Sequence, residues 1–254
     1  MRIKDKVAIV TGIASGIGKG TAILFAEEGA KVVGGDINAE DGNHTVEMIH
    51  AKGGEAIFVP TDVAKSAMVR NLVEHAVSTY GGVDILFSNV GVAIGNPIVD
   101  VSEEEWDQVM AVNLRSMFLC CKYVIPEMQK RGKGSIVLMS SGNGLIAEPA
   151  TASYCASKAA IIGMTRSIAT DYGKYNIRIN AVCPTYTRTP LVERWINSGV
   201  DPSLSWEKVN SLHVLNRIAE VEEIARAVLF LASDDSSIVT GTTLAADGGL
   251  TCFR

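Results

Sequence analysis

A tyrosine and a lysine four residues apart carry the first chemical signal of the chain. Tyr154 and Lys158 stand in a stretch whose apolar residues recur at helical spacing, and an i, i+4 separation places both side chains on one helix face. A phenol titrates near 10, too high for a base at neutral pH. A lysine ammonium at about 4 Å, with an effective dielectric near 20, favours the phenolate by about 4 kcal/mol, which would bring the phenol pKa to about 7. The pair is predicted to be a general acid and base, although the same pattern is common on solvated helices.

A serine precedes this pair by 13 residues. Ser141 follows directly after the apolar run SIVLMS, which is typical of a buried strand. Doubly wound folds bind ligands at the carboxyl ends of their strands, so the Ser141 hydroxyl is expected to hold a substrate oxygen against the phenol. A nucleophilic role is disfavoured, because no G-x-S-x-G turn surrounds Ser141 and no histidine with a supporting motif could be its partner.

A glycine-rich turn follows the first apolar run. It reads TGIASGIG from Thr11 to Gly18 and leads into a stretch with helical spacing. Glycines there permit a tight turn and bring backbone N–H groups close to a pyrophosphate at the helix N-terminus. A nucleoside-triphosphate loop does not fit, because Gly12 and Gly18 are one residue too far apart and Gly20 stands where Ser or Thr should bind magnesium.

The second apolar run, KVVGGD, ends at Asp36, 18 residues beyond Gly18. A carboxylate there accepts hydrogen bonds from an adenosine ribose and repels a 2′-phosphate. No Arg or Lys stands at residues 13–16 or 37–38 to offset that repulsion. Taken alone, Asp36 would also suit an ordinary strand end, but beside the glycine turn it predicts NAD rather than NADP as the cofactor.

Short apolar runs alternate with helix-period stretches along nearly the whole chain. Strands are expected near 7–11, 32–36, 56–59, 84–88, 135–140, 177–182 and 243–246. Helices are expected near 17–29, 40–52, 66–80, 103–130, 153–173 and 221–232. Strands without polar alternation suit a parallel sheet buried on both faces. The fold class is therefore predicted to be α/β, a Rossmann-type doubly wound parallel sheet of about seven strands in a single domain over residues 1–254.

Composition narrows the possible functions. The 254 residues carry 23 Lys and Arg against 28 Asp and Glu, a net charge of −5, so no basic surface for nucleic acid is indicated. Uncharged apolar runs fall short of the roughly 18 residues that span a bilayer, and the N-terminus lacks a signal-peptide pattern. Five cysteines without a C-x-x-C pair and four histidines without ligand spacing favour neither disulfides nor a metal site. We expect a soluble, cytoplasmic protein with neither a membrane nor a nucleic-acid partner.

The stretch 185–214 breaks the alternation, since it holds two prolines, a glycine and two tryptophans. An irregular insertion of this length is often a lid over a binding site, and a surface loop with incidental helix is the alternative. Its apolar residues could close over a substrate while a cation pairs with a substrate carboxylate, or they could pack on the domain. The apolar residues are Leu191, Trp195, Ile196, Leu204, Trp206 and Leu212, and the cationic or titratable ones are Arg188, Arg194, Lys208 and His213.

Taken in order, these motifs resemble the short-chain dehydrogenase/reductase family from Lys6 to Gly249. The residues that carry the resemblance are the TGIASGIG turn, Asp36, Asp62-Val63, Asn89-Val90-Gly91, Asn113, Ser141, Tyr154 with Lys158, Pro184, Thr189 and Asp247-Gly248-Gly249. The resemblance implies an oxidoreductase that transfers a hydride between NAD and a secondary alcohol or ketone, with a tyrosine as general acid and base. It also implies that Asn113 holds a water linking Lys158 to solvent. The expected catalytic residues are therefore Asn113, Ser141, Tyr154 and Lys158.

The resemblance further implies contacts to each part of the cofactor. Asp62 and Val63 are expected at the adenine, Asn89 and Gly91 at the adenosine ribose, and Lys158 at the nicotinamide ribose. The loop after the sixth strand is expected beside the nicotinamide carboxamide. The expected cofactor-binding residues are Gly12, Ser15, Ile17, Gly18, Asp36, Asp62, Val63, Asn89, Gly91, Tyr154, Lys158, Pro184, Thr187 and Thr189.

Two residues depart from the family pattern. Val90 stands where Ala is usual and adds bulk near the ribose, and Thr185 follows Pro184 where Gly is frequent. Because Thr does not readily adopt positive φ, the loop after the sixth strand is expected to take a different path. The sequence leaves the substrate open among hydroxy acids, sugars, polyols, steroids and cyclic alcohols.

Two other functions stay open, an NADPH-dependent carbonyl reductase of the 3-oxoacyl type and a catalytically silent dinucleotide-sensing protein. Asp36 disfavours the first, and the presence of all the expected catalytic residues disfavours the second. Family members commonly form homotetramers or dimers, so the resemblance implies a homo-oligomer paired through the helices expected at 103–130 and 153–173. Met117, Phe118 and Leu119 could lie in that interface or in the core.

Overall fold

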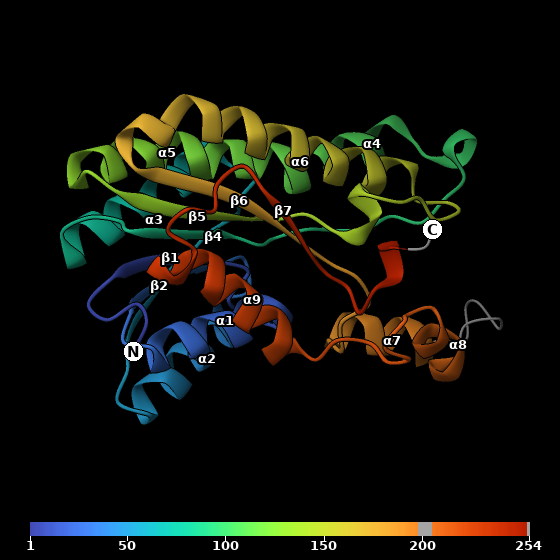
Figure 1. Ribbon diagram of the computed structural model, residues 1–254, viewed down its shortest axis with the longest axis horizontal. Helices are drawn as coiled ribbons and strands as arrows, with labels where there is room; N and C mark the ends of the chain where they lie inside the picture. The colour runs from blue at the N-terminus through green and yellow to red at the C-terminus, as the bar shows by residue number, and fades with distance from the viewer. Residues whose placement is uncertain (198–204, 253–254) are drawn as a thin grey trace.

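Seven parallel strands form one sheet in the order β3-β2-β1-β4-β5-β6-β7 (Figure 1). The structure, a computed structural model, describes residues 1–197 and 205–252. The strands are β1 Val7–Thr11, β2 Lys31–Asp36, β3 Glu55–Pro60, β4 Ile85–Ser88, β5 Gly134–Met139, β6 Ile177–Pro184 and β7 Thr243–Ala246. Each expected strand is present within about two residues of its predicted bounds, and the α/β doubly wound class is confirmed.

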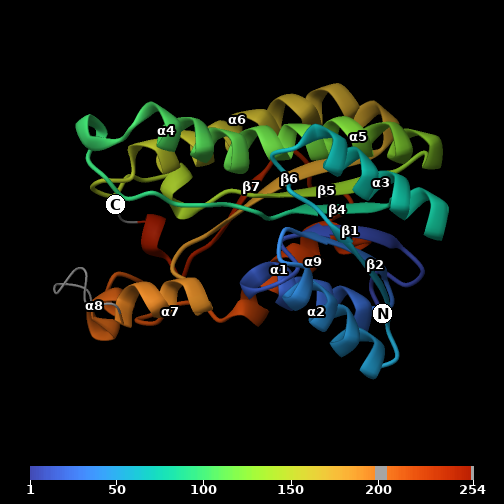
Figure 2. The same cartoon turned by 180° about the vertical axis from the view of Figure 1, so that it is seen from behind.

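Helices cover both faces of the sheet, as Figures 1 and 2 show. On one face lie α3 Ser66–Tyr80, α4 Glu103–Val109, α5 Ser116–Arg131 and α6 Ala152–Tyr172. On the other lie α1 Gly16–Glu27, α2 Ala39–Ala51 and α9 Val221–Ala232. Covered on both sides, β1 and β4 are buried at every position, which explains their unbroken apolar sequences.

The strand order has its topological switch point at β1. β1 pairs with β2 on one side and with β4 on the other, so the chain connections diverge at β1. In doubly wound sheets, ligands bind beyond the carboxyl ends of the strands at this point. The glycine turn follows β1 and Ser141 follows β5, so the topology brings both to that edge.

The predicted single helix at 103–130 is interrupted. α4 and α5 are joined by a π-helical segment, Met110–Arg115, which holds Asn113. Such wider turns inside helices are frequent at functional sites. Among the described residues, Glu103–Arg131 is also long and apolar enough to span a membrane, but half of its most apolar window is buried in the fold. Met117 and Leu119 belong to the core, whereas Phe118 is 48% exposed.

The stretch 185–214 is more regular than predicted. It holds α7 Pro190–Asn197 and α8 Trp206–Ser211, which lie together at the carboxyl edge of the sheet in Figure 1. Ile196 and Val209 form a small hydrophobic cluster with Ile218, separate from the main core. Part of the apolar surface of the stretch 185–214 is therefore buried in this small cluster. Leu204 and the side chains of Leu191, Arg194 and Trp195 lie outside the described part of the chain.

Candidate active site

Ser141, Tyr154 and Lys158 converge at the carboxyl edge of the sheet. Ser141 follows β5 and caps the short 3-10 turn Gly142–Gly144, while Tyr154 and Lys158 lie one turn apart on α6. The Ser141 hydroxyl is hydrogen-bonded to the Tyr154 phenol, and Lys158 Nζ lies 5.5 Å from the centroid of the Tyr154 ring. Lys158 is 2% exposed, and its Nζ donates to the carbonyl oxygen of Met139 at 3.0 Å.

The expected pKa of the phenol near 7 is not found. Burial raises the pKa of Tyr154 above its ordinary value, and the hydrogen bond with Ser141 acts in the opposite direction. Burial also lowers the pKa of Lys158 to about 8. The expectation counted the attraction between the two charges and omitted the cost of removing both from water. Lys158 also turns its nitrogen toward Met139.

Asn113 ties the catalytic helix to the loop after β4. Its Oδ1 accepts from Val92 N at 2.8 Å, and its Nδ2 donates to Val92 O at 2.9 Å and to Ser157 Oγ at 3.0 Å. A Cβ added at Gly91 would lie 3.2 Å from Lys158 Nζ and 3.4 Å from Asn113 Oδ1. Asn113, Gly91 and Lys158 thus meet around one point beside the sheet, which glycine keeps open.

The glycine turn forms a cradle around the start of α1. Gly12 and Gly16 have φ of 78° and 53°, in the left-handed region that glycine favours. A side chain at Gly18 would overlap the Gly12 carbonyl oxygen, and one at Gly12 would lie 2.6 Å from Asn89 Nδ2. Ser15, the N-cap, makes no side-chain cap, and no acid stands in the first turn. The first N–H groups of α1 are therefore left for an anion, which fits a dinucleotide pyrophosphate.

Asp36 closes the far side of this cradle. Its Oδ2 accepts from Ala14 N at 3.0 Å, which links the end of β2 to the glycine turn, and its Oδ1 accepts from Asn38 N at 3.0 Å. Thr61 N donates to the Asp36 carbonyl oxygen at 2.7 Å. Asp62, the residue expected to contact the adenine, therefore follows directly after a residue that is bonded to Asp36. The Asp62 carboxylate accepts from Ala64 N at 3.0 Å.

The other expected cofactor residues lie along the same edge. Asn89 N donates to Thr11 Oγ1 at 3.0 Å, which holds the end of β4 against β1. Gly16 and Thr189 are neighbours, since a Cβ at Gly16 would lie 3.3 Å from Thr189 Cγ2. Pro184 ends β6, Thr187 is buried, Val63 is buried, and Ile17 packs against the main core. The start of the 185–214 stretch therefore lies beside the glycine turn.

Thr185 and Val90, the two residues that depart from the family pattern, each have defined neighbours in the structure. Thr185 has no positive φ; its Oγ1 lies 2.8 Å from Nε2 of His213, which is 4% exposed. His213 Nδ1 lies 3.0 Å from the Val209 carbonyl oxygen, so the histidine joins α8 to the loop after β6. Val90 lies near the glycine turn, 3.3 Å from where a Gly12 Cβ would be.

A carboxylate that sequence reasoning missed, Glu148, is hydrogen-bonded to the segments that follow β5 and β6. Glu148 Oε2 accepts from Asn143 Nδ2 at 3.0 Å and Glu148 Oε1 accepts from Tyr186 Oη at 3.0 Å. Its charge is among the influences that raise the pKa of Tyr154. The sequence gives one indirect signal, because the two partners of Glu148 lie close to expected site residues. Asn143 follows Ser141 by two residues, and Tyr186 follows Pro184 by two.

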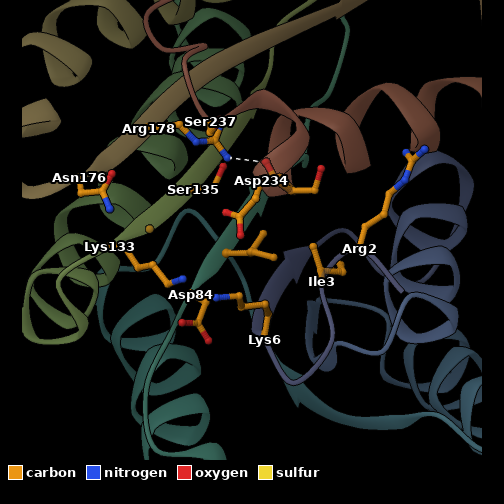
Figure 3. A pocket seen from close by; sticks show the side chains of 14 residues that line it. Arg2, Ile3, Lys6, Asp84, Lys133, Ser135, Asn176, Arg178, Asp234 and Ser237 are labelled. Carbon is orange, nitrogen blue, oxygen red and sulfur yellow. Dashed lines mark hydrogen bonds between the residues drawn. The ribbon is translucent and has the colours of Figure 1, made fainter.

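A cavity of about 190 Å³ lies at the opposite, amino-terminal edge of the sheet (Figure 3). Lys6, Lys133 and Arg178 surround Asp84 and Asp234 there. Asp84 accepts two 2.9 Å hydrogen bonds from Arg131, and Arg178 donates to backbone carbonyls around the end of α9. None of the expected site residues lines this cavity, which is bordered by groups that tie the strand ends together.

The sequence from residue 12 to 251 matches the family described as enoyl-(acyl carrier protein) reductase. A crystal structure of levodione reductase superposes with a TM-score of 0.95 at 32% identity, covering 100% of both chains. The chain belongs to the short-chain dehydrogenase/reductase family. Family members bind a nicotinamide dinucleotide, and this chain is accordingly an oxidoreductase.

Curated relatives differ in what their names say they act on. An uncharacterized oxidoreductase of Thermotoga maritima is 44% identical, with 99% of both chains covered. The 3-oxoacyl-(acyl-carrier-protein) reductase FabG of the same organism is 40% identical over 98% of this chain and 99% of its own. A 2,5-dichloro-2,5-cyclohexadiene-1,4-diol dehydrogenase of Sphingobium indicum is 41% identical over 99% of each. The family is common to all of them, whereas the substrates in their names differ.

Proposed function

We propose that this short-chain dehydrogenase/reductase oxidises a secondary alcohol with NAD. The observation that carries the proposal is Asp36, whose carboxylate is held at the phosphate turn by the 3.0 Å hydrogen bond from Ala14 N. A 2′-phosphate at that point would meet a negative charge, and the neighbouring residues 13–16 and 37–38 include no Arg or Lys to neutralise it.

The proton chemistry is assigned to the residues around Tyr154. A bound nicotinamide would supply the acceptor for the hydride that leaves the carbinol carbon. Tyr154 takes the hydroxyl proton at its phenol oxygen, and Ser141, already hydrogen-bonded to that phenol, orients the alcohol oxygen. The Lys158 ammonium stabilises the phenolate. Asn113, whose Oδ1 lies on the same side of Gly91 as Lys158 Nζ, holds a water that passes the proton to solvent.

The cofactor would be held by the residues along the carboxyl edge. The N–H groups at the start of α1 bind the pyrophosphate, and Asp36 binds the adenosine ribose. Lys158 binds the nicotinamide ribose, and the loop after β6 binds the carboxamide. The assigned cofactor contacts are Gly12, Ser15, Ile17, Gly18, Asp36, Asp62, Val63, Asn89, Gly91, Tyr154, Lys158, Pro184, Thr187 and Thr189.

The competing function is an NADPH-dependent 3-oxoacyl reductase, which the similarity to FabG favours. Initial rates at 340 nm, measured with NAD and separately with NADP over secondary alcohols, sugars and hydroxy acids, separate the two. We expect turnover with NAD at a kcat/KM at least tenfold above that with NADP. Turnover with NADP alone would contradict the proposal and support the reductase.

Three wider expectations accompany this function. We propose a homo-oligomer, a dimer or tetramer, paired through α5 and α6, where Phe118 offers an exposed aromatic ring. We propose that α7 and α8 form a lid over the substrate, since Thr189 at its start lies against Gly16 of the phosphate turn. We expect the enzyme to work in the cytoplasm on a small-molecule substrate, without nucleic acid or membrane as a partner.

A further inference from the structure

We infer that Glu148 selects the substrate: its carboxylate accepts a hydrogen bond from a second hydroxyl group and repels anionic alcohols, so the substrate is a neutral diol or polyol. The inference rests on the proposed function, because it assumes that Tyr154 and Ser141 hold the alcohol that is oxidised. It adds the chemical class that the motifs alone leave open.

Glu148 is placed by three segments that meet at the site. Asn143 donates to Glu148 Oε2 from the turn that begins at Ser141, and its own backbone N donates to Ser141 Oγ at 3.1 Å. Tyr186 donates to Glu148 Oε1 from the loop that follows β6. The Glu148 carbonyl accepts from Thr151 Oγ1 at 2.7 Å, at the start of the helix that carries Tyr154. The carboxylate is thus fixed relative to both groups that hold the reacting oxygen.

The negative charge of Glu148 is not cancelled by its partners. Asn143 and Tyr186 are both neutral donors, and among the residues that the structure describes no cation forms an ion pair with Glu148. Arg188, two residues after Tyr186, is paired with Glu220 at 3.0 Å and stacked over the Trp206 ring at 4.7 Å. The charge acts on the phenol itself, since it contributes to the raised pKa of Tyr154.

Each oxygen of this carboxylate can accept a further hydrogen bond. A carboxylate oxygen offers two lone-pair positions, and Oε1 and Oε2 each accept one side-chain hydrogen bond here. A hydroxyl group on the substrate supplies the missing donor. A substrate carboxylate or phosphate supplies none and meets a like charge in a partly buried site, where screening is weak.

A diol satisfies both halves of the site at once. One carbinol lies at Ser141 and Tyr154 for oxidation, and the other donates its O–H to Glu148. The similarity to a dehydrogenase named for a cyclohexadiene-1,4-diol, 41% identical over 99% of each chain, agrees with this substrate class. A hydroxy acid of the same size would place its negative charge where Glu148 already stands.

Three substrates on one ring test the inference. Cyclohexanol has no second group, cyclohexanediols (1,2-, 1,3- and 1,4-) have a neutral donor, and 4-hydroxycyclohexanecarboxylate has an anion. With NAD and wild-type enzyme, we expect kcat/KM for the best diol to exceed that for cyclohexanol by about tenfold and that for the hydroxy acid by about a hundredfold. A hydroxy acid oxidised as efficiently as the best diol would overturn the inference while leaving the proposed function in place.

Two variants separate the charge of Glu148 from its role in joining the loops. Glu148→Gln keeps the size and removes the charge, so the diol-to-hydroxy-acid ratio of kcat/KM should fall at least tenfold. Tyr186→Phe is the matched control, because it breaks the same link at 3.0 Å but keeps the carboxylate, and the ratio should stay within about twofold. Thermal melts of both variants check folding.

The inference about Glu148 and the proposed function would be contradicted by different results. A ratio that Glu148→Gln leaves unchanged, or that Tyr186→Phe lowers equally, would reduce Glu148 to a link between loops and overturn the inference. Absence of turnover with NAD and NADP for every ring substrate and every other alcohol tested would instead contradict the proposed function, and the inference with it.

Discussion

The ammonium nitrogen of Lys158 lies 5.5 Å from the centroid of the Tyr154 ring; the lysine is buried and the tyrosine is partly buried. Burial acts against the charged form of each, raising the pKa of Tyr154 and lowering that of Lys158 to about 8. A phenolate and an ammonium formed together in this site offset that cost for each other. The pair is therefore arranged so that ionisation of the phenol depends on the charge of the lysine.

Lys158→Met should stabilise the fold while removing activity. The pKa of Lys158 falls from 10.5 to about 8, so keeping the ammonium in the folded state at pH 7 costs about 3 kcal/mol. Methionine avoids that cost but leaves the Met139 carbonyl without its donor, which takes back about 1–2 kcal/mol. We expect a net gain of about 1–2 kcal/mol in the free energy of unfolding at pH 7, measured by urea denaturation.

The pH dependence of that gain fixes its cause. Between pH 8 and 10.5 the unfolded chain holds the Lys158 proton and the folded chain releases it, so wild-type stability rises with pH relative to the variant. The advantage of Lys158→Met should therefore shrink through this window. An advantage that is constant from pH 7 to 10 would show that the lysine carries no burial cost.

Cofactor preference should invert when charge at the ribose site is reversed. Ile37 is 77% exposed beside Asp36, so an arginine there costs the fold little. Asp36→Ser with Ile37→Arg removes the repulsion and supplies a guanidinium for a 2′-phosphate. We expect the NADP-to-NAD ratio of kcat/KM to rise at least a hundredfold. Ile37→Arg alone is the control, and a ratio that neither variant changes would remove Asp36 from the ribose site.

Gly18→Ala should block the phosphate turn. The new Cβ would overlap the Gly12 carbonyl oxygen and lie 2.8 Å from Asn89 Nδ2, so the turn must open. We expect NADH affinity, measured by fluorescence titration, to fall at least tenfold. Gly163→Ala on α6 is the matched control, since nothing lies within 4 Å of its Cβ, and there the helix should gain about 0.5–1 kcal/mol. Equal NADH affinity in the two variants would contradict the claim that the glycine turn binds the cofactor.

Residues with local signals could be predicted from the sequence. The central strands β1 and β4 are buried on both faces, and the apolar runs gave the places of all seven strands within about two residues. The glycine turn and Asp36 were predicted at one edge of the sheet, and the structure joins them there by the hydrogen bond from Ala14 N. The π-helical turn at Asn113 could not be predicted, because it depends on the 2.8 and 2.9 Å bonds to Val92 on another loop.

Features formed by segments far apart in the chain could not be predicted from the sequence. Glu148 gains its position only when the loops after β5 and β6 meet, and no local pattern records that meeting. The raised pKa of Tyr154 was missed for a related reason, since the degree of burial is set by packing and not by the spacing to Lys158.

The central claim is that Tyr154 is the acid and base of an NAD-dependent alcohol oxidation. The direct measurement compares wild type with Tyr154→Phe, recording NADH formation at 340 nm with the best alcohol and NADH binding by fluorescence. We expect kcat to fall by at least about a thousandfold while the NADH dissociation constant stays within about threefold, because only the phenol oxygen is lost. Turnover by Tyr154→Phe within tenfold of wild type would contradict the account.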